Sequence, residues 1–156
     1  MVNNYALSDL TKILFEFGQE KFSKRIAKAI VKQREKKEIF TTFELRKLVE
    51  SKINPRYRIK SLARVFQAIR IEVNEELEEL REGLKQAIEF LAPPGRLCVI
   101  SYHSLEHRII KDIIKRQDKT ALRMVTKKPI APSVEEIEEN PRARSARLWV
   151  AERLQS

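Results

Sequence analysis

Residues 95–106 read Gly95-Arg96-Leu97-Cys98-Val99-Ile100-Ser101-Tyr102-His103-Ser104-Leu105-Glu106, and this stretch decides the fold class. Its continuous apolar run predicts a short strand that is buried on both faces, as in a parallel sheet. Polar residues end the strand, and a helix follows at once, with Ser104 as its expected cap. A strand that leads directly into a helix indicates an α/β protein. We expect Cys98, the only cysteine, to be a small core residue in a reducing compartment.

The turn between this strand and this helix is the first candidate for a functional site. Ligands of open α/β sheets bind at the carboxyl ends of strands, which is where Ser101, His103 and Ser104 are expected to lie. A histidine there can donate to, accept from or stack on a base. The alternative is that these side chains only cap the helix and hold the turn. With one cysteine and two histidines, a closed zinc site is not expected.

A long helix is expected before the strand. Apolar residues recur at steps of three and four from residue 62 to residue 91, which predicts a helix of about 30 residues that Pro93-Pro94 ends. Arg70 and Asn74 lie beside this apolar stripe, where polar groups either satisfy one another or face a ligand. Beyond residue 106, the sequence predicts strands at 122–125 and 148–151 and a short helix at 133–139.

The first 60 residues are strongly basic, with 15 basic against 7 acidic residues. Periodicity predicts amphipathic helices here, one of which carries lysines and arginines on its exterior. Thr41 and Glu44 form the pattern of a capping box. Arg56-Tyr57-Arg58 belongs to a basic loop that contains an aromatic residue, a combination that suits base stacking and phosphate contact. The alternative is that these residues form an ordinary solvated surface.

Charge and composition favour a polyanionic partner. The chain of 156 residues carries a net charge of +10, so nucleic acid is the first candidate, although solvated lysines alone would give the same balance. No apolar stretch approaches the roughly 20 residues that span a bilayer, and we expect a cytoplasmic protein without a membrane partner. The three glycines are far apart, so no glycine-rich loop that could cradle a nucleotide or a methyl donor is expected.

Four blocks of sequence resemble one known family. The first block is Phe66-Gln67-Ala68-Ile69-Arg70-Ile71-Glu72-Val73-Asn74-Glu75-Glu76-Leu77, and the second is the stretch at 95–106. The third and fourth are Lys127-Lys128-Pro129-Ile130 and Asn140-Pro141-Arg142-Ala143-Arg144-Ser145-Ala146-Arg147. In this order and spacing, they resemble the MraW/RsmH-type 16S rRNA (cytosine-N(4)-)methyltransferases, and the resemblance extends from about Tyr5 to Arg153.

The resemblance implies a helix-rich α/β fold in two parts. Residues 1–60 are similar to a helical insertion that helps to recognise RNA. Residues 61–156 are similar to the last strands and helices of a Rossmann-like methyltransferase domain, with an incomplete sheet. The family implies S-adenosylmethionine as the methyl donor. It also implies one cytosine in the decoding region of 16S rRNA, on the small ribosomal subunit, as the target.

The family's donor-binding and catalytic motifs are expected to precede this chain, so the resemblance assigns no catalytic or cofactor-binding residue here. The isolated chain is therefore expected to be inactive without a separate amino-terminal half. Two positions depart from the family pattern. Lys60-Ser61-Leu62-Ala63 stands before Arg64 where the family usually has His-Pro-Ala-Thr, and His107 stands where the family usually has an acidic residue. These changes leave the local role of both positions open.

Nine residues are the candidates for contacting RNA or the edge of the substrate pocket. The alternative function is a non-catalytic, basic RNA-binding or ribosome-assembly module. Such a module would act alone or as a homodimer, in which a second copy of the chain covers the exposed sheet edge. The nine candidates are Ser101, His103, Ser104, Arg64, Arg70, Asn74, Arg142, Arg144 and Arg147.

Overall fold

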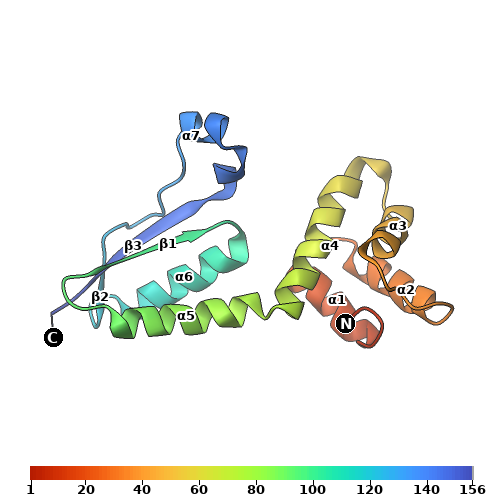
Figure 1. Cartoon of the computed structure of the whole chain (residues 1–156), viewed down its shortest axis with the longest axis horizontal. Coiled ribbons are helices and arrows are strands. Elements are labelled where there is room, and N and C mark those ends of the chain that lie inside the picture. The colour runs from red at the N-terminus through yellow and green to blue at the C-terminus, as the bar shows by residue number, and fades with distance from the viewer. Residues whose placement is uncertain (156) are drawn as a thin grey trace. The chain divides into compact units, whose positions relative to one another are not determined.

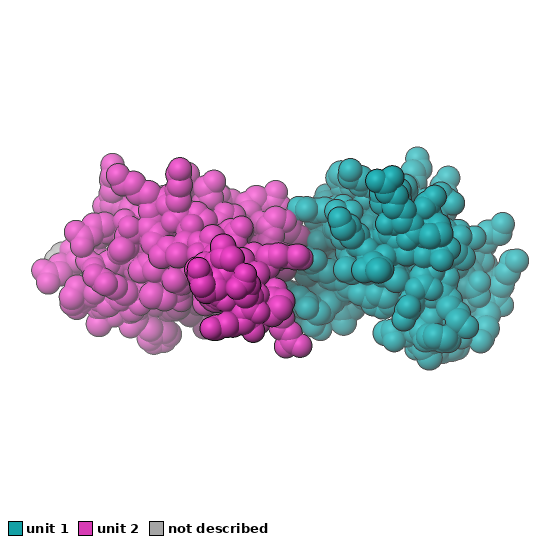
Figure 2. All heavy atoms as spheres, turned by 90° about the horizontal axis from the view of Figure 1, so that it is seen from above, with its two compact units in different colours: residues 1–76 teal, residues 77–156 magenta. Residues whose placement is uncertain are grey.

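A computed structural model describes residues 1–155 of the chain (Figure 1). The chain divides into two compact units, of which unit 1 comprises residues 1–76 and unit 2 begins at Leu77 (Figure 2). The expected helix-rich α/β fold is confirmed. The division into an insertion at 1–60 and a catalytic part at 61–156 stays a prediction. Among the described residues, no helix is both long and apolar enough to cross a membrane.

Unit 1 is built from helices. It contains α1 (Leu7–Glu16), α2 (Ser23–Arg34), α3 (Thr42–Lys52), the 3₁₀ turn η1 (Pro55–Tyr57) and α4 (Arg58–Val73). Helix α1 packs against α2 and α4, and α3 packs against the same two helices. Apolar residues at helical spacing form the core, which leaves most basic residues of α2 exposed, namely Lys24, Arg25, Lys28 and Lys32. Core members from the four helices include Leu10, Ile26, Val49, Val65 and Ala68.

The expected long helix is in fact two helices, and that prediction was wrong. Asn74 and Glu75 separate α4 from α5 (Glu76–Phe90). The φ of Glu75 is 51°, in the left-handed region that interrupts a right-handed helix. Glu76 holds the break, because its carboxylate accepts a hydrogen bond from the Asn74 amide and lies 2.7 Å from Nε of Arg70. Apolar spacing continues across the break, so periodicity alone does not reveal it.

Unit 2 combines α5 with a three-stranded sheet and two further helices. After α5 come β1 (Arg96–Ser101), α6 (Ser104–Gln117), β2 (Leu122–Met124), α7 (Val134–Glu139), the 3₁₀ turn η2 (Pro141–Ser145) and β3 (Arg147–Arg153). The predicted strands and the predicted short helix are confirmed. The strand order is β1-β3-β2, and both outer strands run antiparallel to β3.

The prediction that β1 lies in a parallel sheet, buried on both faces, was wrong. Leu97 and Val99 face the helices, where α5 and α6 pack against Trp149 of β3. The alternate residues Cys98 and Ile100 are exposed, so Cys98 is not the core residue we expected. Helices cover only one face of the sheet. A strand in such a sheet usually alternates apolar and polar residues, whereas β1 is apolar on both faces.

The uncovered side is the open face of the sheet, and it is largely apolar. Directly opposed residues of antiparallel strands share a face, which places Cys98 opposite Val150 and Ile100 opposite Leu148 on this side. Ile130 extends the face through a bridge to Leu148. Ile100 and Ile130 keep 54% and 52% of their surface exposed. Within the described residues, the outer edge of β1 has no strand partner.

Candidate nucleic-acid interface

Unit 2 has a cavity of about 490 Å³ at the carboxyl end of β1. It brings together the three residues predicted from the strand–helix turn, Ser101, His103 and Ser104, with Arg144 and Arg147. These two arginines are 40 or more positions away in the sequence. The remaining lining residues are Tyr102, His107, Pro129 and Ser145. Five of the nine predicted site residues therefore meet in one place.

Antiparallel pairing of β1 with β3 explains why the two segments meet. Ser101, the last residue of β1, is paired in register with Arg147, the first residue of β3. The buried Ser101 hydroxyl donates to the backbone carbonyl of Arg147 at 3.4 Å. Arg144 lies on η2, which Asn140 starts by accepting a hydrogen bond from the backbone N–H of Arg142. The cavity thus forms where the sheet ends and η2 returns the chain to it.

His103, not Ser104, is the cap of α6, which corrects our prediction. Nδ1 of His103 accepts from the backbone N–H of Glu106, whose carboxylate accepts from the backbone N–H of His103. The same carboxylate accepts from the backbone N–H of Tyr102 at 2.7 Å. Burial raises the pKa of Glu106, but the hydrogen bonds from His103 and Tyr102 outweigh it, so the net pKa is lowered. Glu106 is therefore ionised, and its carboxylate stabilises the turn through these hydrogen bonds.

His107 is a cavity residue that sequence reasoning did not select. It lies four residues after His103, one helical turn further along α6. Its Nδ1 accepts from the indole N–H of Trp149 at 3.1 Å, so Nε2 carries the proton of the neutral ring. Burial lowers the pKa of His107, and the positive charges of Lys111 and Arg147 lower it further. The neutral ring of His107 therefore offers its Nε2–H as a hydrogen-bond donor without adding charge to the cavity.

The cavity has a net positive lining that suits an anion. Within residues 1–155, neither Arg144 nor Arg147 forms an ion pair with a carboxylate. Guanidinium groups bind phosphate through paired donors, while serine hydroxyls and a neutral imidazole offer hydrogen bonds to a base or a ribose. The arrangement can therefore hold a nucleotide by its phosphate and by one polar edge.

Four predicted residues do not line this cavity. Arg142 is exposed on η2, two positions before the lining residue Arg144, and does not line the cavity itself. Arg64, Arg70 and Asn74 lie on or next to α4 in unit 1, where Arg70 and Asn74 both bind Glu76. The structure gives Arg70 and Asn74 a local structural partner, and a binding role for these four residues stays a prediction.

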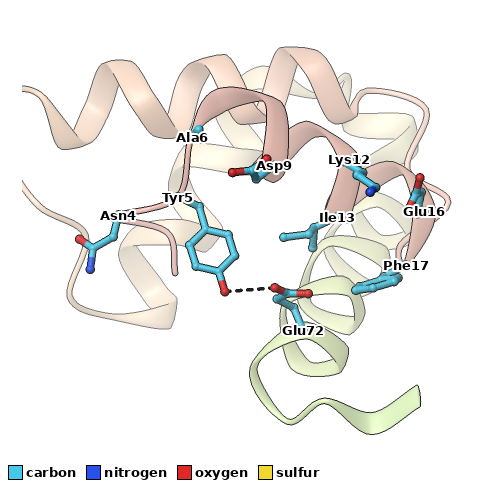
Figure 3. A pocket seen from close by; sticks show the side chains of 9 residues that line it. All are labelled: Asn4, Tyr5, Ala6, Asp9, Lys12, Ile13, Glu16, Phe17 and Glu72. Carbon is cyan, nitrogen blue, oxygen red and sulfur yellow. Dashed lines mark hydrogen bonds between the residues drawn. The ribbon is translucent and has the colours of Figure 1, made fainter. Parts of the chain in front are cut away.

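A cavity of about 480 Å³ in unit 1 has the opposite character (Figure 3). Asp9, Glu16 and Glu72 line it against the single cation Lys12. The hydroxyl of Tyr5 donates to Glu72 at 3.0 Å, and this hydrogen bond raises the pKa of Tyr5. Three carboxylates repel a polyanion, so the lining of this cavity does not suit a nucleic acid.

The described residues do not form a site for S-adenosylmethionine or for a metal ion. Gly18 is packed against the backbone of α4, Gly83 is within α5, and Gly95 precedes β1. None of them follows a strand, and the β1–α6 turn contains no glycine, so the tight cradle for a nucleotide-like donor is not built here. Among residues 1–155, no group of three or more potential ligands could hold a metal.

By its fold, the chain is a helix-rich α/β protein in which a helical unit precedes a unit with a small antiparallel sheet. It belongs to the MraW methylase family, whose model matches residues 1–154, and this confirms the family resemblance.

Three bacterial relatives, each named ribosomal RNA small subunit methyltransferase H, show the extent of the match. The Persephonella marina protein is 49% identical over 158 residues, which cover 99% of this chain and 54% of that protein. The Caldicellulosiruptor saccharolyticus protein is 46% identical over 171 residues, with shares of 99% and 56%. The Kosmotoga olearia protein is 45% identical over 159 residues, with shares of 99% and 52%. The chain spans about half the length of the curated relatives it matches.

Proposed function

We propose that this chain is the RNA-holding part of an S-adenosylmethionine-dependent methyltransferase. Its target is the exocyclic amine of a cytosine in the decoding region of 16S rRNA, and its macromolecular partner is the small ribosomal subunit. Membership of the methylase family and the names of the relatives support the rRNA target. The specific base is what the sequence resemblance implies. We expect the protein to act in the cytoplasm, where ribosomal subunits are found.

The observation that carries the proposal is the strand-end cavity of unit 2. Arg144 and Arg147 line this cavity, and within residues 1–155 no carboxylate forms an ion pair with either guanidinium, for which phosphates are good partners. Ser101 and His107 supply short hydrogen-bonding groups beside them. Enzymes that act on a base in folded RNA must first take that base out of its stack, and they then hold the displaced nucleotide by its edge and its flanking phosphates. The cavity has the chemistry for this holding role.

The donor is assigned to residues outside this chain. S-adenosylmethionine supplies the methyl group, and the described residues do not fit it, so no step of the transfer is assigned to them. The open face of the sheet is apolar, and within residues 1–155 the outer edge of β1 presents backbone groups without a strand partner; the other half of a complete enzyme would cover both. We therefore expect the isolated chain to be inactive and to gain activity with an amino-terminal half from a relative.

Reconstitution tests this proposal. The chain is mixed with the amino-terminal half of the Persephonella marina relative, and transfer of radioactive methyl from S-adenosylmethionine to small ribosomal subunits is measured. The double substitution Arg144→Gln with Arg147→Gln should lower the rate at least about tenfold, as expected for the loss of charged hydrogen bonds to phosphate. The double substitution Arg81→Gln with Lys85→Gln is the matched control, because it removes two positive charges from α5, outside the cavity. Equal rates for the double variant and the control would refute the role of the cavity.

A non-catalytic RNA-binding or assembly module is the second candidate. It is favoured by the basic groove in unit 1, whose lining contains four cations, Lys21, Lys24, Arg25 and Lys28. Under this reading, RNA binding would be tight and salt-dependent for the chain alone or for its homodimer. Methyl transfer would then stay undetectable after the amino-terminal half is added.

A further inference from the structure

Trp149 holds one of the histidines that line the strand-end cavity. His107 lines the cavity from α6, and Trp149 lies on β3 with 2% of its surface exposed. The centres of the two rings are 5.3 Å apart, at an interplanar angle of 33°, and the indole N–H donates to Nδ1 of His107 at 3.1 Å. Because an indole N–H can only donate, the proton of the neutral imidazole lies on Nε2. One contact thus fixes both the tautomer and the orientation of the ring.

Nε2 of His107 is a donor that solvent reaches. Within residues 1–155, Nε2 makes no hydrogen bond, and the residue is half-buried. In the same range, the buried side-chain nitrogen and oxygen atoms that lack a hydrogen bond are Oε2 of Glu20 and Nε2 of His103. Since Nε2 of His107 is not one of them, it is accessible, and the space that His107 lines is the cavity. A nucleotide in the cavity can therefore accept a hydrogen bond from it.

His103 does not offer an accessible donor. Its Nδ1 accepts from the backbone N–H of Glu106 at 3.4 Å, and its buried Nε2 lies 3.1 Å from Oε1 of the same glutamate. The ring of His103 is therefore directed towards Glu106, where it helps to begin α6. Of the two histidines in the chain, His107 is the one whose N–H a ligand can reach.

The surroundings of His107 keep its ring neutral. Burial lowers the pKa of His107 most, and the charges of Lys111 on α6 and Arg147 on β3 lower it further. Within residues 1–155, no carboxylate forms an ion pair with this ring. Charge-assisted hydrogen bonds are about twice as strong as neutral ones, so a phosphate binds the guanidinium groups of Arg144 and Arg147 in preference to a neutral N–H. The N–H of His107 is then left for an uncharged acceptor.

We propose that His107 is a specificity-determining residue of the strand-end cavity, that its Nε2–H donates to an uncharged oxygen of the bound nucleotide, and that Trp149 is its positioning residue. The oxygen is a carbonyl of the base or a hydroxyl of the ribose. Trp149 is buried and therefore acts through His107 and not on the ligand. The nucleotide as the class of ligand rests on the proposed function, whereas the donor and its fixed direction follow from the His107–Trp149 pair.

The positioning role is tested first, in the full chain without a ligand. The chain is labelled with ¹⁵N in its two histidines, and His107→Gln identifies the NMR signals of His107. At alkaline pH, Nδ1 should show the shift of a bare nitrogen and Nε2 that of a protonated one. Trp149→Phe keeps an aromatic ring but removes the indole donor, so the ring should exchange between tautomers and the two shifts should move towards each other. Unchanged shifts would overturn the role of Trp149.

The donor is tested by titrating cytidine 5′-monophosphate into the full chain, followed by the backbone amide shifts of the cavity residues. His107→Leu should weaken binding about three- to tenfold, as expected for one lost hydrogen bond. His107→Gln should retain most of the affinity, because a carboxamide can accept from Trp149 and still donate to the ligand. His107→Asp should bind no better than His107→Leu, because a carboxylate cannot donate. Gln117→Leu is the control, since Gln117 ends α6 and does not line the cavity.

Two smaller probes identify the group that the donor meets. Ribose 5-phosphate lacks the base, and inorganic phosphate lacks the base and the ribose. A loss in His107→Leu with both cytidine 5′-monophosphate and ribose 5-phosphate supports the proposal with a ribose oxygen as the acceptor. A loss with cytidine 5′-monophosphate alone supports it with a base carbonyl. An equal loss with inorganic phosphate would overturn it, because His107 would then be one more phosphate ligand.

Two further results would overturn the proposal, namely equal affinity of the wild type and His107→Leu, and equal affinity of His107→Gln and His107→Asp. The proposed function fails separately. Its failure would appear as inorganic phosphate binding that does not change when Arg144 and Arg147 are replaced by glutamine, whereas the tautomer of His107 is read without any ligand. Circular dichroism of each variant checks that the fold is retained, and Trp149→Phe is the variant for which this check matters most because Trp149 is a core residue.

Discussion

At the scale of single residues, Gly18 and Gly83 differ in the space that the fold leaves for a side chain. A methyl group added at Gly18 would lie 2.6 Å from the carbonyl oxygen of Arg64 and 2.8 Å from that of Leu14, and neither backbone atom can move easily. Gly18→Ala should therefore destabilise unit 1 by about 1–3 kcal/mol, the usual cost of overpacking. Chemical denaturation followed by circular dichroism measures the loss.

Gly83 provides the control for this substitution. Nothing lies within 4 Å of a methyl group added there, on the exposed side of α5. Gly83→Ala should stabilise α5 by about 0.5–1 kcal/mol, because alanine has less backbone freedom to lose than glycine. If Gly18→Ala proved as harmless as Gly83→Ala, the close approach of α1 and α4 would be wrong.

His107 makes the stability of unit 2 depend on pH. Its folded pKa lies below the ordinary 6.5, so the folded chain binds fewer protons than the unfolded chain between these two values. The stabilising contribution of the neutral ring is complete above pH 6.5 and is lost as the pH falls through the folded pKa. Protonation of Nδ1 would also remove the acceptor for the Trp149 indole.

Denaturation followed by the fluorescence of Trp149, the only tryptophan, should show this loss of stability in acid. His107→Gln should show a smaller loss, because glutamine keeps an acceptor for the indole but does not titrate. In an NMR titration, Arg147→Gln should move the pKa of His107 back towards 6.5, since it removes one of the charges that lower it. An unchanged pKa would mean that Arg147 does not face the ring.

Sequence reasoning at this scale found the right turn but not its details. Ser101 and His103 could be selected because a strand end before a helix has a known chemistry. That Arg147 joins them follows from the β1–β3 register, which no local pattern specifies. The capping role of His103 had one visible signal, a glutamate three residues later, but histidine is not among the usual caps.

At the scale of elements, the start of α3 depends on its capping box. The Glu44 backbone N–H donates to Oγ1 of Thr41 at 3.1 Å, and the Glu44 carboxylate accepts from the backbone N–H groups of Phe40 and Thr41. The hydrogen bond from the Phe40 backbone, then those from Lys37 and the Thr41 backbone, lower the pKa of Glu44 to about 2. This box was predicted from sequence and is confirmed, because the pattern is local.

Thr41→Ala should cost about 1 kcal/mol of stability, since an orphan N–H of the first turn loses its acceptor. Thr41→Ser should retain most of the stability because it keeps the hydroxyl. The difference is measured by urea denaturation of the two variants beside the wild type. A result in which alanine and serine behave alike would show that the hydroxyl does not cap α3.

The elements that were predicted wrongly failed for a shared physical reason. The break at Glu75 and the half-covered face of β1 depend on contacts outside the local segment, whereas periodicity reports only which positions are apolar. The sequence did identify which positions are apolar, both in the stripe at residues 62–91 and in the run that forms β1. What they pack against, and whether anything covers the second face of β1, is decided by the rest of the fold.

At the scale of the whole molecule, the open face of the sheet leaves apolar surface exposed to solvent in the isolated chain. Cys98, Ile100, Leu148, Val150 and Ile130 form an apolar band beside an unpaired strand edge. Such a face is expected to self-associate unless it is covered. The chain spans about half the length of each relative, and the role proposed for it has the other half of such an enzyme cover this face.

We therefore expect the isolated chain to form larger species as its concentration rises, measured by sedimentation velocity. Ile100→Lys should shift it towards the monomer, because the lysine places a charge on the open face, and a buried interface does not tolerate an unpaired charge. Phe15→Lys is the control, since Phe15 is also an exposed, large apolar residue but lies on α1 of unit 1. Adding the amino-terminal half of a relative should convert the larger species into a one-to-one complex. A wild-type chain that stays monomeric at every concentration would show that the open face needs no cover, and the argument that it docks the other half would fail with it.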